Sequence, residues 1–227
     1  MSEFDGYSER YEQLLNESVR ITGESGDYFA RYKAEFVAER MAPKPRCRIL
    51  DYGCGIGLVS AQLKQYLPEA RVDGYDPSRL RLDRVKPSLL SQGLFVDSRD
   101  DLERDYDIIL MANVLHHIEP QWRQELVSSA ARLLAQSGKL VIFEHNPANP
   151  LTRLAVDRCP FDEDAILLPP RESAKYLLNS NLEDVRRDYI VFFPRVFRWF
   201  RPMERALKWV PFGAQYAAYG TRKEASA

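Results

Sequence analysis

Short apolar runs alternate with stretches of helical periodicity from about residue 46 to the end of the chain. The apolar runs predict seven strands, which span residues 47–52, 71–76, 94–96, 107–112, 139–144, 188–193 and 215–221. Apolar residues at helical spacing predict helices over 58–67, 78–85, 120–136 and 172–178. Alternation of this kind is typical of a mostly parallel sheet with covering helices. We therefore expect an α/β fold with a doubly wound, seven-stranded sheet and helices on both faces.

Three segments fall outside this alternation. Residues 1–45 carry aromatic side chains at helical spacing, among them Tyr28, Phe29 and Tyr32, and predict a helical N-terminal extension or lid. Residues 146–170 are rich in proline and predict an irregular excursion, and residues 194–213 separate the last two strands. We expect one ligand-binding domain over 46–227, with both insertions bordering its ligand site.

Composition narrows the class of protein. The chain has 227 residues and a formal net charge of -1, which provides no general attraction to nucleic acid, so we expect no nucleic-acid partner. Cys47, Cys54 and Cys159 show no ligand-like spacing, so neither a disulfide framework nor a metal site is predicted. No apolar run approaches the roughly 20 residues of a membrane span, and the polar N-terminus does not resemble a signal peptide. These features predict a cytoplasmic protein of undetermined oligomeric state.

A glycine-rich turn joins the first strand to the first covering helix, with the sequence Ile49-Leu50-Asp51-Tyr52-Gly53-Cys54-Gly55-Ile56-Gly57. Closely spaced glycines let bare backbone and a helix N-terminus approach a ligand. Asp76 ends the second strand about 20 residues later, where a carboxylate accepts hydrogen bonds from ribose hydroxyls. We therefore expect an adenosine-type ligand.

The details of this turn discriminate between ligand classes. A nicotinamide fingerprint reads G-x-G-x-x-G, whereas only one residue separates Gly55 from Gly57 here, and the chain has no GxxxxGK[ST] stretch for a nucleoside triphosphate. Asp51, two residues before the first glycine, suits a cationic group and opposes a pyrophosphate. A nicotinamide oxidoreductase is therefore disfavoured.

Five stretches resemble, in order, the motifs of class I S-adenosylmethionine-dependent methyltransferases. They are ILDYGCGIG at 49–57, GYDPS at 74–78, Phe95-Val96-Asp97-Ser98, ILMANVLHHI at 109–118 and SGKLVIFEH at 137–145. The resemblance covers roughly residues 46–145 and implies a Rossmann-like fold and S-adenosylmethionine as cofactor. It also implies a role for each motif residue. Asp51 would lie near the methionine ammonium, and the backbone of Gly53, Cys54 and Gly55 would line the methionine end of the site. Asp76 would bind the ribose, and Asp97 and Ser98 would bind the adenine. Asn113 would close the floor of the cofactor site. A site with three carboxylates and no lysine suits a sulfonium cation better than a phosphate.

The chain has three histidines, His116, His117 and His145, and they follow the fourth and fifth strands at the edge where doubly wound sheets bind ligands. Methyl transfer to a hydroxyl benefits from a base of near-neutral pKa. We hypothesise that His117 or His145 is the general base or orients the acceptor, with Glu144 in support. The alternative is that one of the pair His116 and His117 only packs or hydrogen-bonds locally. The insertions at 146–170 and 194–213 leave from the same edge, so we expect them to form the acceptor pocket.

Residues 195–210 form a second informative segment. Five apolar side chains follow one helical face: Val196, Phe200, Met203, Leu207 and Val210. Five basic residues against Glu204 alone leave a local charge of +4, and Pro202 predicts a split into two short helices, with the proline first in the second one. One interpretation is a basic amphipathic element that contacts a membrane surface or gates the pocket. The other, which we favour over membrane contact, is that the stripe packs on the domain and the arginines are solvated.

The sequence thus predicts an S-adenosylmethionine-dependent methyltransferase that acts on a small apolar, lipid-like or sugar-type acceptor. A hydroxyl oxygen is the expected acceptor atom, and nitrogen and carbon remain open. The alternative is a non-catalytic S-adenosylmethionine-binding module that docks a protein or a membrane through the basic aromatic segment. The cofactor motifs fit both hypotheses, so turnover distinguishes them.

Overall fold

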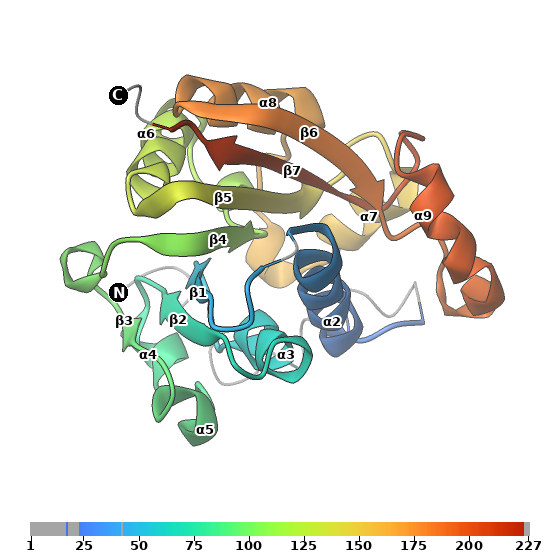
Figure 1. The fold of residues 1–227 in the computed structure, drawn as a ribbon. Coiled ribbons are helices and arrows are strands. Elements are labelled where there is room, and N and C mark those ends of the chain that lie inside the picture. Colours follow the sequence, from blue (N-terminus) through green and yellow to red (C-terminus); the bar gives the residue numbers. More distant parts are fainter. Residues whose placement is uncertain (1–16, 18–22, 42, 225–227) are drawn as a thin grey trace.

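A seven-stranded sheet of order β3-β2-β1-β4-β5-β7-β6 forms the centre of the molecule (Figure 1). The computed structural model describes residues 17, 23–41 and 43–224. The strands are β1 (Arg48–Tyr52), β2 (Arg71–Tyr75), β3 (Phe95–Val96), β4 (Tyr106–Ala112), β5 (Leu134–His145), β6 (Leu182–Ile190) and β7 (Gln215–Arg222). β7 pairs antiparallel with both of its neighbours, and the other pairs are parallel. The predicted doubly wound, seven-stranded, mostly parallel α/β fold is confirmed.

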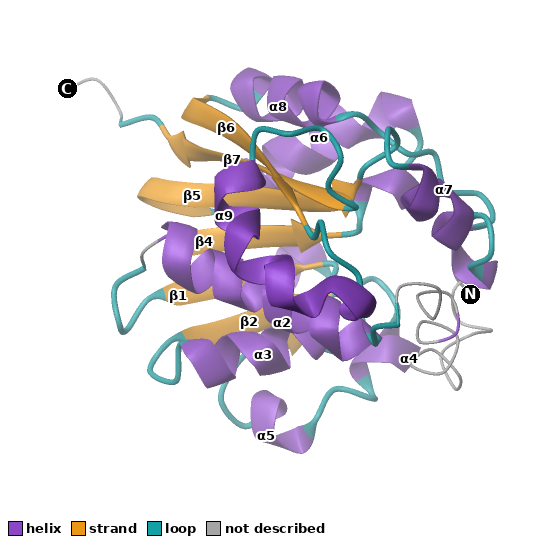
Figure 2. Ribbon diagram, turned by 90° about the vertical axis from the view of Figure 1, so that its right-hand side faces the viewer, coloured by secondary structure: helices purple, strands orange, loops and turns teal. Residues whose placement is uncertain are grey.

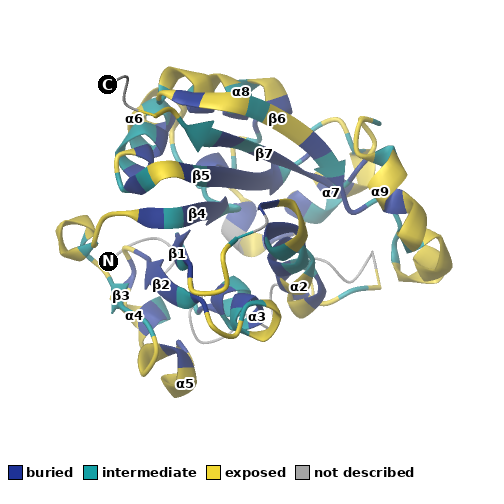
Figure 3. Cartoon of the chain, in the orientation of Figure 1, coloured by how far each residue is buried: buried dark blue, intermediate teal, exposed yellow. Residues whose placement is uncertain are grey.

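Helices cover both faces of this sheet (Figure 2). One face packs on α2 (Gly26–Phe36) and α3 (Leu58–Tyr66), and the other on α6 (Pro120–Ala131) and α8 (Pro170–Asn179). Successive strand residues point to opposite faces, so Ile49 joins the α3 side of the core and Leu50 the α6 side. The central strands are therefore buried on both faces (Figure 3), which explains their continuous apolar sequences.

Short helices complete the periphery. They are η3 (Val37–Met41), a π-helix that continues α2, α4 (Arg79–Leu82), α5 (Pro87–Leu90), η4 (Arg99–Asp101), η5 (Leu115–His117), α7 (Pro150–Val156), η6 (Pro160–Asp162), η7 (Arg195–Met203) and α9 (Glu204–Leu207). Of the predicted extension over 1–45, the structure thus describes helix over 26–41, and residues 1–16 and 18–22 lie outside the described part. No helix among the described residues has the length and apolar character needed to cross a bilayer.

Two element boundaries differ from the prediction. The helix predicted to reach residue 136 ends at Ala131, because Leu134 instead pairs with Tyr106 and begins a long β5 with an irregularity in its register. The sixth strand spans 182–190 rather than 188–193. It is an edge strand with several exposed polar side chains, so its first half carries no apolar run for a sequence pattern to detect.

Both insertions also differ from the prediction. Residues 146–170 are not irregular throughout, since α7 begins with Pro150 behind Asn149, whose side chain accepts hydrogen bonds from the next helix N–H groups. In the other insertion the backbone kinks at Phe197, and Pro202 lies inside η7 rather than at the start of the next helix. The expectation that the apolar stripe of this segment packs on the domain is wrong, because Val196 and Met203 are exposed.

Candidate active site

The glycine turn between β1 and α3 brings bare backbone to the carboxyl edge of the sheet. Gly53, Gly55 and Gly57 all have positive φ angles, between 56° and 85°. A Cβ on Gly53 would lie 2.5 Å from Cγ2 of Val114, so the strand-four loop leaves room for hydrogen only. The N–H groups of Gly53 and Cys54 donate to the carbonyl of Tyr75, which fixes the turn against β2. This geometry leaves glycine backbone without side chains beside two carboxylates.

Asp51 and Asp76 are those two carboxylates, and both are buried. Ser60 donates a hydrogen bond to Oδ2 of Asp51 at 2.7 Å, whereas Oδ1 is buried without a hydrogen-bond partner among the described residues. Burial raises the pKa of Asp51 to about 6. Asp76 accepts the N–H groups of Gly55 and Ser78 at 2.9 and 3.0 Å. The unmet oxygen of Asp51 is suited to a cationic hydrogen-bond donor on a ligand.

Lys33 was missed by sequence reasoning, and the expectation of a site without lysine is wrong. It lies on α2, is 5% exposed and lines the same pocket as Asp51 and Asp76. Burial lowers its pKa to about 8, against the opposing charges of Glu144 and Asp51. The signal was present, since Lys33 stands four residues from both Phe29 and Val37, on the buried face of the helix.

Asp97 and Ser98, which the resemblance assigns to the adenine, follow β3 and are absent from the pocket lining. Asp97 is exposed, and Ser98 accepts a hydrogen bond from the N–H of Asp100 and so caps η4. Asn113 does line the pocket, with φ at 60°, and its side-chain amide donates to Nε2 of His145 at 2.8 Å. The adenine contacts of Asp97 and Ser98 therefore stay predictions.

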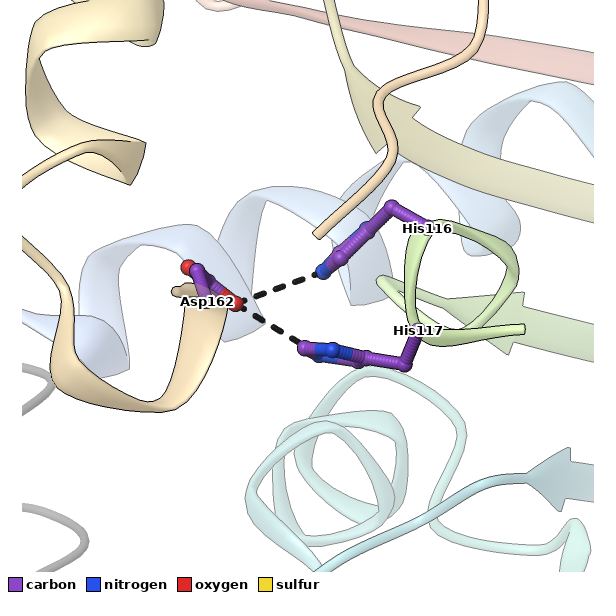
Figure 4. A group of neighbouring side chains, drawn as sticks. All are labelled: His116, His117 and Asp162. Atoms are coloured by element: carbon purple, nitrogen blue, oxygen red, sulfur yellow. Dashed lines mark ion pairs between the residues drawn. The ribbon is translucent and has the colours of Figure 1, made fainter. Parts of the chain in front are cut away.

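The three histidines gather at the ends of β4 and β5, and Figure 4 shows His116 and His117 beside Asp162 of η6. Glu144 lies 2.5 Å from Nδ1 of His116 and accepts the N–H of Leu115 at 2.7 Å. Its direct partner is thus His116, rather than His117 or His145 as we expected. Nε2 of His116 and Nε2 of His117 lie 3.5 and 3.4 Å from Oδ1 of Asp162. Asp162 was missed because its segment carries no motif.

These contacts set the charges of the cluster. Burial opposes the charge of His116, but Glu144 and Asp162 overcome it and raise the pKa of His116 to about 9. Burial and the charge of His116 lower the pKa of His117 to about 3 and that of His145 to about 4. Near neutral pH, His116 is therefore a cation between two carboxylates, and the other two histidines are neutral.

The same groups have the composition of a metal-binding set. The ligating atoms of His116, His117 and Asp162 lie within 4.8 Å of one another, and two histidines with a carboxylate suit several transition metals. The positive charge of protonated His116 already balances negative charge on its neighbours Glu144 and Asp162. The absence of a metal stays a prediction.

A pocket of about 310 Å³ joins these groups. Its lining includes Lys33, Asp51, Gly53, Cys54, Gly55, Asp76 and Asn113, together with His116, His117 and His145. Glu144 stands behind His116, fully buried. The remaining wall is largely apolar and includes Phe29, Ile118, Leu151, Val156, Phe192 and Phe193. Several residues of the first predicted insertion, between 149 and 162, line the pocket. From the second insertion, 194–213, only Pro194 does so among the described residues, so the expectation that this insertion forms the pocket wall is wrong apart from Pro194.

Comparison with known proteins relates the chain to methyltransferases. A family model described as a methyltransferase domain matches residues 26–204. Among curated proteins, a ubiquinone biosynthesis O-methyltransferase from Bradyrhizobium diazoefficiens is 27% identical over 67% of this chain and 64% of its own length. A ribosomal RNA large subunit methyltransferase G from Vibrio campbellii is 28% identical over 57% of this chain and 36% of its own length. The chain thus spans only part of both relatives.

Solved structures share the fold at low sequence identity. Magnesium protoporphyrin IX methyltransferase from Synechocystis, solved with bound SAH, superposes with a TM-score of 0.68 at 15% identity and covers 97% of this chain and 96% of its own. A SAM-dependent methyltransferase from Archaeoglobus fulgidus gives 0.63 at 17% identity, with 85% and 94% of the two chains covered. With the family model spanning most of its length, the chain belongs to the methyltransferase-domain family, and it shares the fold of solved S-adenosylmethionine-dependent methyltransferases.

Proposed function

We propose that the chain transfers the methyl group of S-adenosylmethionine to a hydroxyl oxygen of a small apolar acceptor. One observation carries this proposal: a single pocket is lined both by the buried carboxylates of Asp51 and Asp76 and by a neutral histidine, His117. The cofactor supplies a methyl group on a positively charged sulfur. The residues of the chain bind, exclude water and hold the proton that the acceptor releases.

The polar lining of the pocket suits the charges of this cofactor. The unpartnered Oδ1 of Asp51 is placed to accept the methionine ammonium, and Lys33 is placed to pair with the methionine carboxylate. Each oxygen of Asp76 accepts one backbone N–H group, and Oδ2 also lies 3.5 Å from the guanidinium of Arg81; the remaining lone pairs are those we assign to ribose hydroxyls. Gly53 and Gly55 present backbone without a side chain beside these groups. The roles of Asp97 and Ser98 at the adenine belong to the same proposal.

His117 is the proposed base: its pKa of about 3 keeps it unprotonated near neutral pH, but makes it a weaker base than the near-neutral one expected from the sequence. His116 already carries a proton near neutral pH, and Nε2 of His145 accepts the amide of Asn113. When bound, S-adenosylmethionine would supply the methyl group and leave as a neutral thioether, and His117 would take up the proton released by the acceptor hydroxyl. Asp162, 3.4 Å from Nε2 of His117, stabilises the resulting imidazolium. Glu144 acts indirectly, because it holds His116 and thereby the loop that carries His117.

The apolar wall supports a small apolar acceptor. Phe29, Leu151, Phe192 and Phe193 line the pocket, and a concave apolar lining favours a compact molecule over a nucleic-acid strand. The name of the Bradyrhizobium relative, a ubiquinone biosynthesis O-methyltransferase, is in accord with a hydroxyl on an apolar skeleton. The ribosomal RNA relatives share a smaller fraction of their length with this chain.

Labelled S-adenosylmethionine tests the proposal directly. We expect label to enter hydroxylated aromatic or isoprenoid compounds and not purified ribosomal RNA. His117→Ala should lower kcat by at least about 100-fold, the usual contribution of a general base, while calorimetry gives an unchanged cofactor Kd. Gln121→Ala, at an exposed position of α6, is the matched control and should leave both constants unchanged. Wild-type turnover in His117→Ala, or label only in RNA, contradicts the proposal.

The alternative function is a non-catalytic cofactor-binding module. Cofactor binding without label transfer to any component of a cell extract would favour it. The polarised cluster of Glu144, His116 and Asp162 supports the enzyme instead, because a module that only binds the cofactor has no need of a buried charge network on the acceptor side.

A further inference from the structure

Residues 195–212 present a surface in which large apolar and basic side chains are interleaved, which we call the basic aromatic surface. Its apolar members are 43% to 76% exposed: Val196, Phe197, Trp199, Phe200, Met203, Trp209 and Phe212. Its exposed basic members are Arg195, Arg198, Lys208 and Arg205, of which Arg205 also pairs with Glu39. Among the described residues, half of all exposed large apolar side chains belong to this one segment. Such concentration marks an interaction site rather than ordinary surface variation.

The inner side of this segment is held by polar contacts. Glu204 is buried and accepts the N–H groups of Phe192 and Phe193 at 3.1 and 3.0 Å. The guanidinium of Arg201 lies 4.3 Å from the centre of the Tyr28 ring and pairs with Glu24. These contacts anchor the segment through Glu204 and Arg201, so its tryptophans and phenylalanines project outward as a consequence of the fold.

The basic aromatic surface is continuous with the pocket at both ends. Residues 191–194 line the pocket and lead directly into η7. At the other end, the side chain of Asn149 donates to the carbonyl of Phe212 at 2.7 Å, and Asn149 and the exposed Leu151 also line the pocket. A partner seated on this surface therefore lies beside the apolar side of the pocket.

We propose that the basic aromatic surface docks the enzyme on an anionic lipid bilayer, so that the pocket faces the membrane. Tryptophan and phenylalanine favour the boundary between headgroups and acyl chains, and the basic side chains around them meet lipid phosphates. A second copy of this chain fits less well, because pairing the surface with itself brings four exposed cations against four more. A nucleic acid fits less well too, because phosphate contacts leave Val196, Met203 and Phe212 without an apolar partner.

Vesicle co-sedimentation of the full chain tests this docking without any need for turnover. We expect the protein to sediment with vesicles of equal parts phosphatidylglycerol and phosphatidylcholine at low salt. Binding should be much weaker to pure phosphatidylcholine and in ~1 M salt, where the Debye length is about 3 Å. Tryptophan emission in a Trp122→Phe background should shift to shorter wavelength on binding, because Trp199 and Trp209 are then the only two tryptophans.

Two double variants separate the apolar and the charged contributions. Trp199→Ser with Trp209→Ser should weaken vesicle binding by at least about 10-fold, since each ring buries a large apolar area. Arg198→Glu with Lys208→Glu should weaken it by a similar factor on anionic vesicles only. The matched controls are Trp122→Ser, which is 62% exposed on α6, and Arg171→Glu with Lys175→Glu at exposed positions of α8. Each control should change binding by less than about 2-fold.

Several outcomes overturn the proposal. They are absence of binding to anionic vesicles at low salt, equal binding by the tryptophan variant and the wild type, and equal loss in a control variant. A dimer in sedimentation equilibrium that the Trp199 and Trp209 variant abolishes would identify a second copy as the occupant. Tighter binding to RNA than to vesicles would identify a nucleic acid. Unchanged cofactor affinity and melting temperature in both double variants show that they are folded, so that a loss of vesicle binding reports on the surface alone.

Discussion

Replacement of Glu144 by glutamine tests the charge network behind the pocket. Glu144 is fully buried, and its carboxylate lies 2.5 Å from Nδ1 of His116. Glutamine keeps the side chain's shape but removes the charge that holds the His116 cation. The rise in the pKa of His116 from 6.5 to about 9 corresponds to roughly 3 kcal/mol, at about 1.36 kcal/mol per pKa unit. Since Asp162 supplies part of this rise, we expect Glu144→Gln to lower the free energy of unfolding by about 2–3 kcal/mol.

The deficit should depend on pH in one direction. Folding raises the pKa of His116, so its stabilisation is complete below the unfolded pKa of 6.5 and is lost as the pH rises through about 9. The difference between wild type and Glu144→Gln is therefore largest near pH 6 and shrinks towards about pH 10. Near pH 6 the melting temperature should fall by about 5–10 °C, at roughly 2–4 °C per kcal/mol for a domain of this size.

Urea unfolding, followed by fluorescence at about pH 6, 8 and 10, measures this dependence. Glu125→Gln is the matched control, because Glu125 is 66% exposed and pairs with Arg132 at the surface. Its effect should stay within about 0.5 kcal/mol at each pH. Equal stability of Glu144→Gln and wild type near pH 6, or a deficit that does not shrink by about pH 10, would refute the assignment of His116 as a buried cation.

Three further predictions concern the pocket. Lys33→Met should weaken S-adenosylmethionine binding by about 10- to 100-fold in calorimetry but leave the Kd of the decarboxylated cofactor unchanged. Equal weakening of both ligands would be inconsistent with a carboxylate partner for Lys33. Gly53→Ala places a Cβ 2.5 Å from Val114 at a φ of 85°. Thermal unfolding should therefore show that the free energy of unfolding falls by about 1–3 kcal/mol, and cofactor binding should weaken. An unchanged melting temperature argues against the tight turn. Treatment with EDTA should leave turnover and stability unchanged, and a stoichiometric metal in the purified protein would show that His116, His117 and Asp162 hold an ion instead.

Much of the fold could be predicted because its central strands are buried on both faces. β4 contains a continuous apolar run, as do the centre of β1 and residues 140–143 of β5, and α3 follows the glycine turn directly. β6 was misplaced because its exposed polar residues belong to an edge strand. The end of α6 was misplaced because Leu133 and Leu134 continue a helical pattern, whereas pairing with Tyr106 places Leu134 in β5. The periodicity of a local stretch of sequence does not show which distant strand a residue will pair with.

The site was predictable where one loop carries it. Gly53, Gly55 and Asp51 share a single motif, and the structure brings them together with Asp76 in one pocket. Lys33 and Asp162 were missed because they reach the pocket from α2 and η6, far along the chain from that motif. The partner of Glu144 was misassigned because three histidines lie within reach of one strand end, and only the loop conformation selects His116. Side-chain networks of this kind depend on the tertiary fold.

The connection between β6 and β7 leaves and re-enters the sheet at one point. Ile190 pairs with Gln215 in the antiparallel register, and the N–H of Ala214 donates to the carbonyl of Val191 at 2.8 Å. Two antiparallel neighbours need only a tight hairpin to be joined, so residues 192–213 are not required for the strand connection itself. A replacement for this stretch has to supply the bond that the carbonyl of Lys208 makes to the N–H of Tyr189 in β6, at 2.7 Å. A graft at these two junctions would test whether the stretch helps to select the acceptor, while the proposed cofactor half is retained.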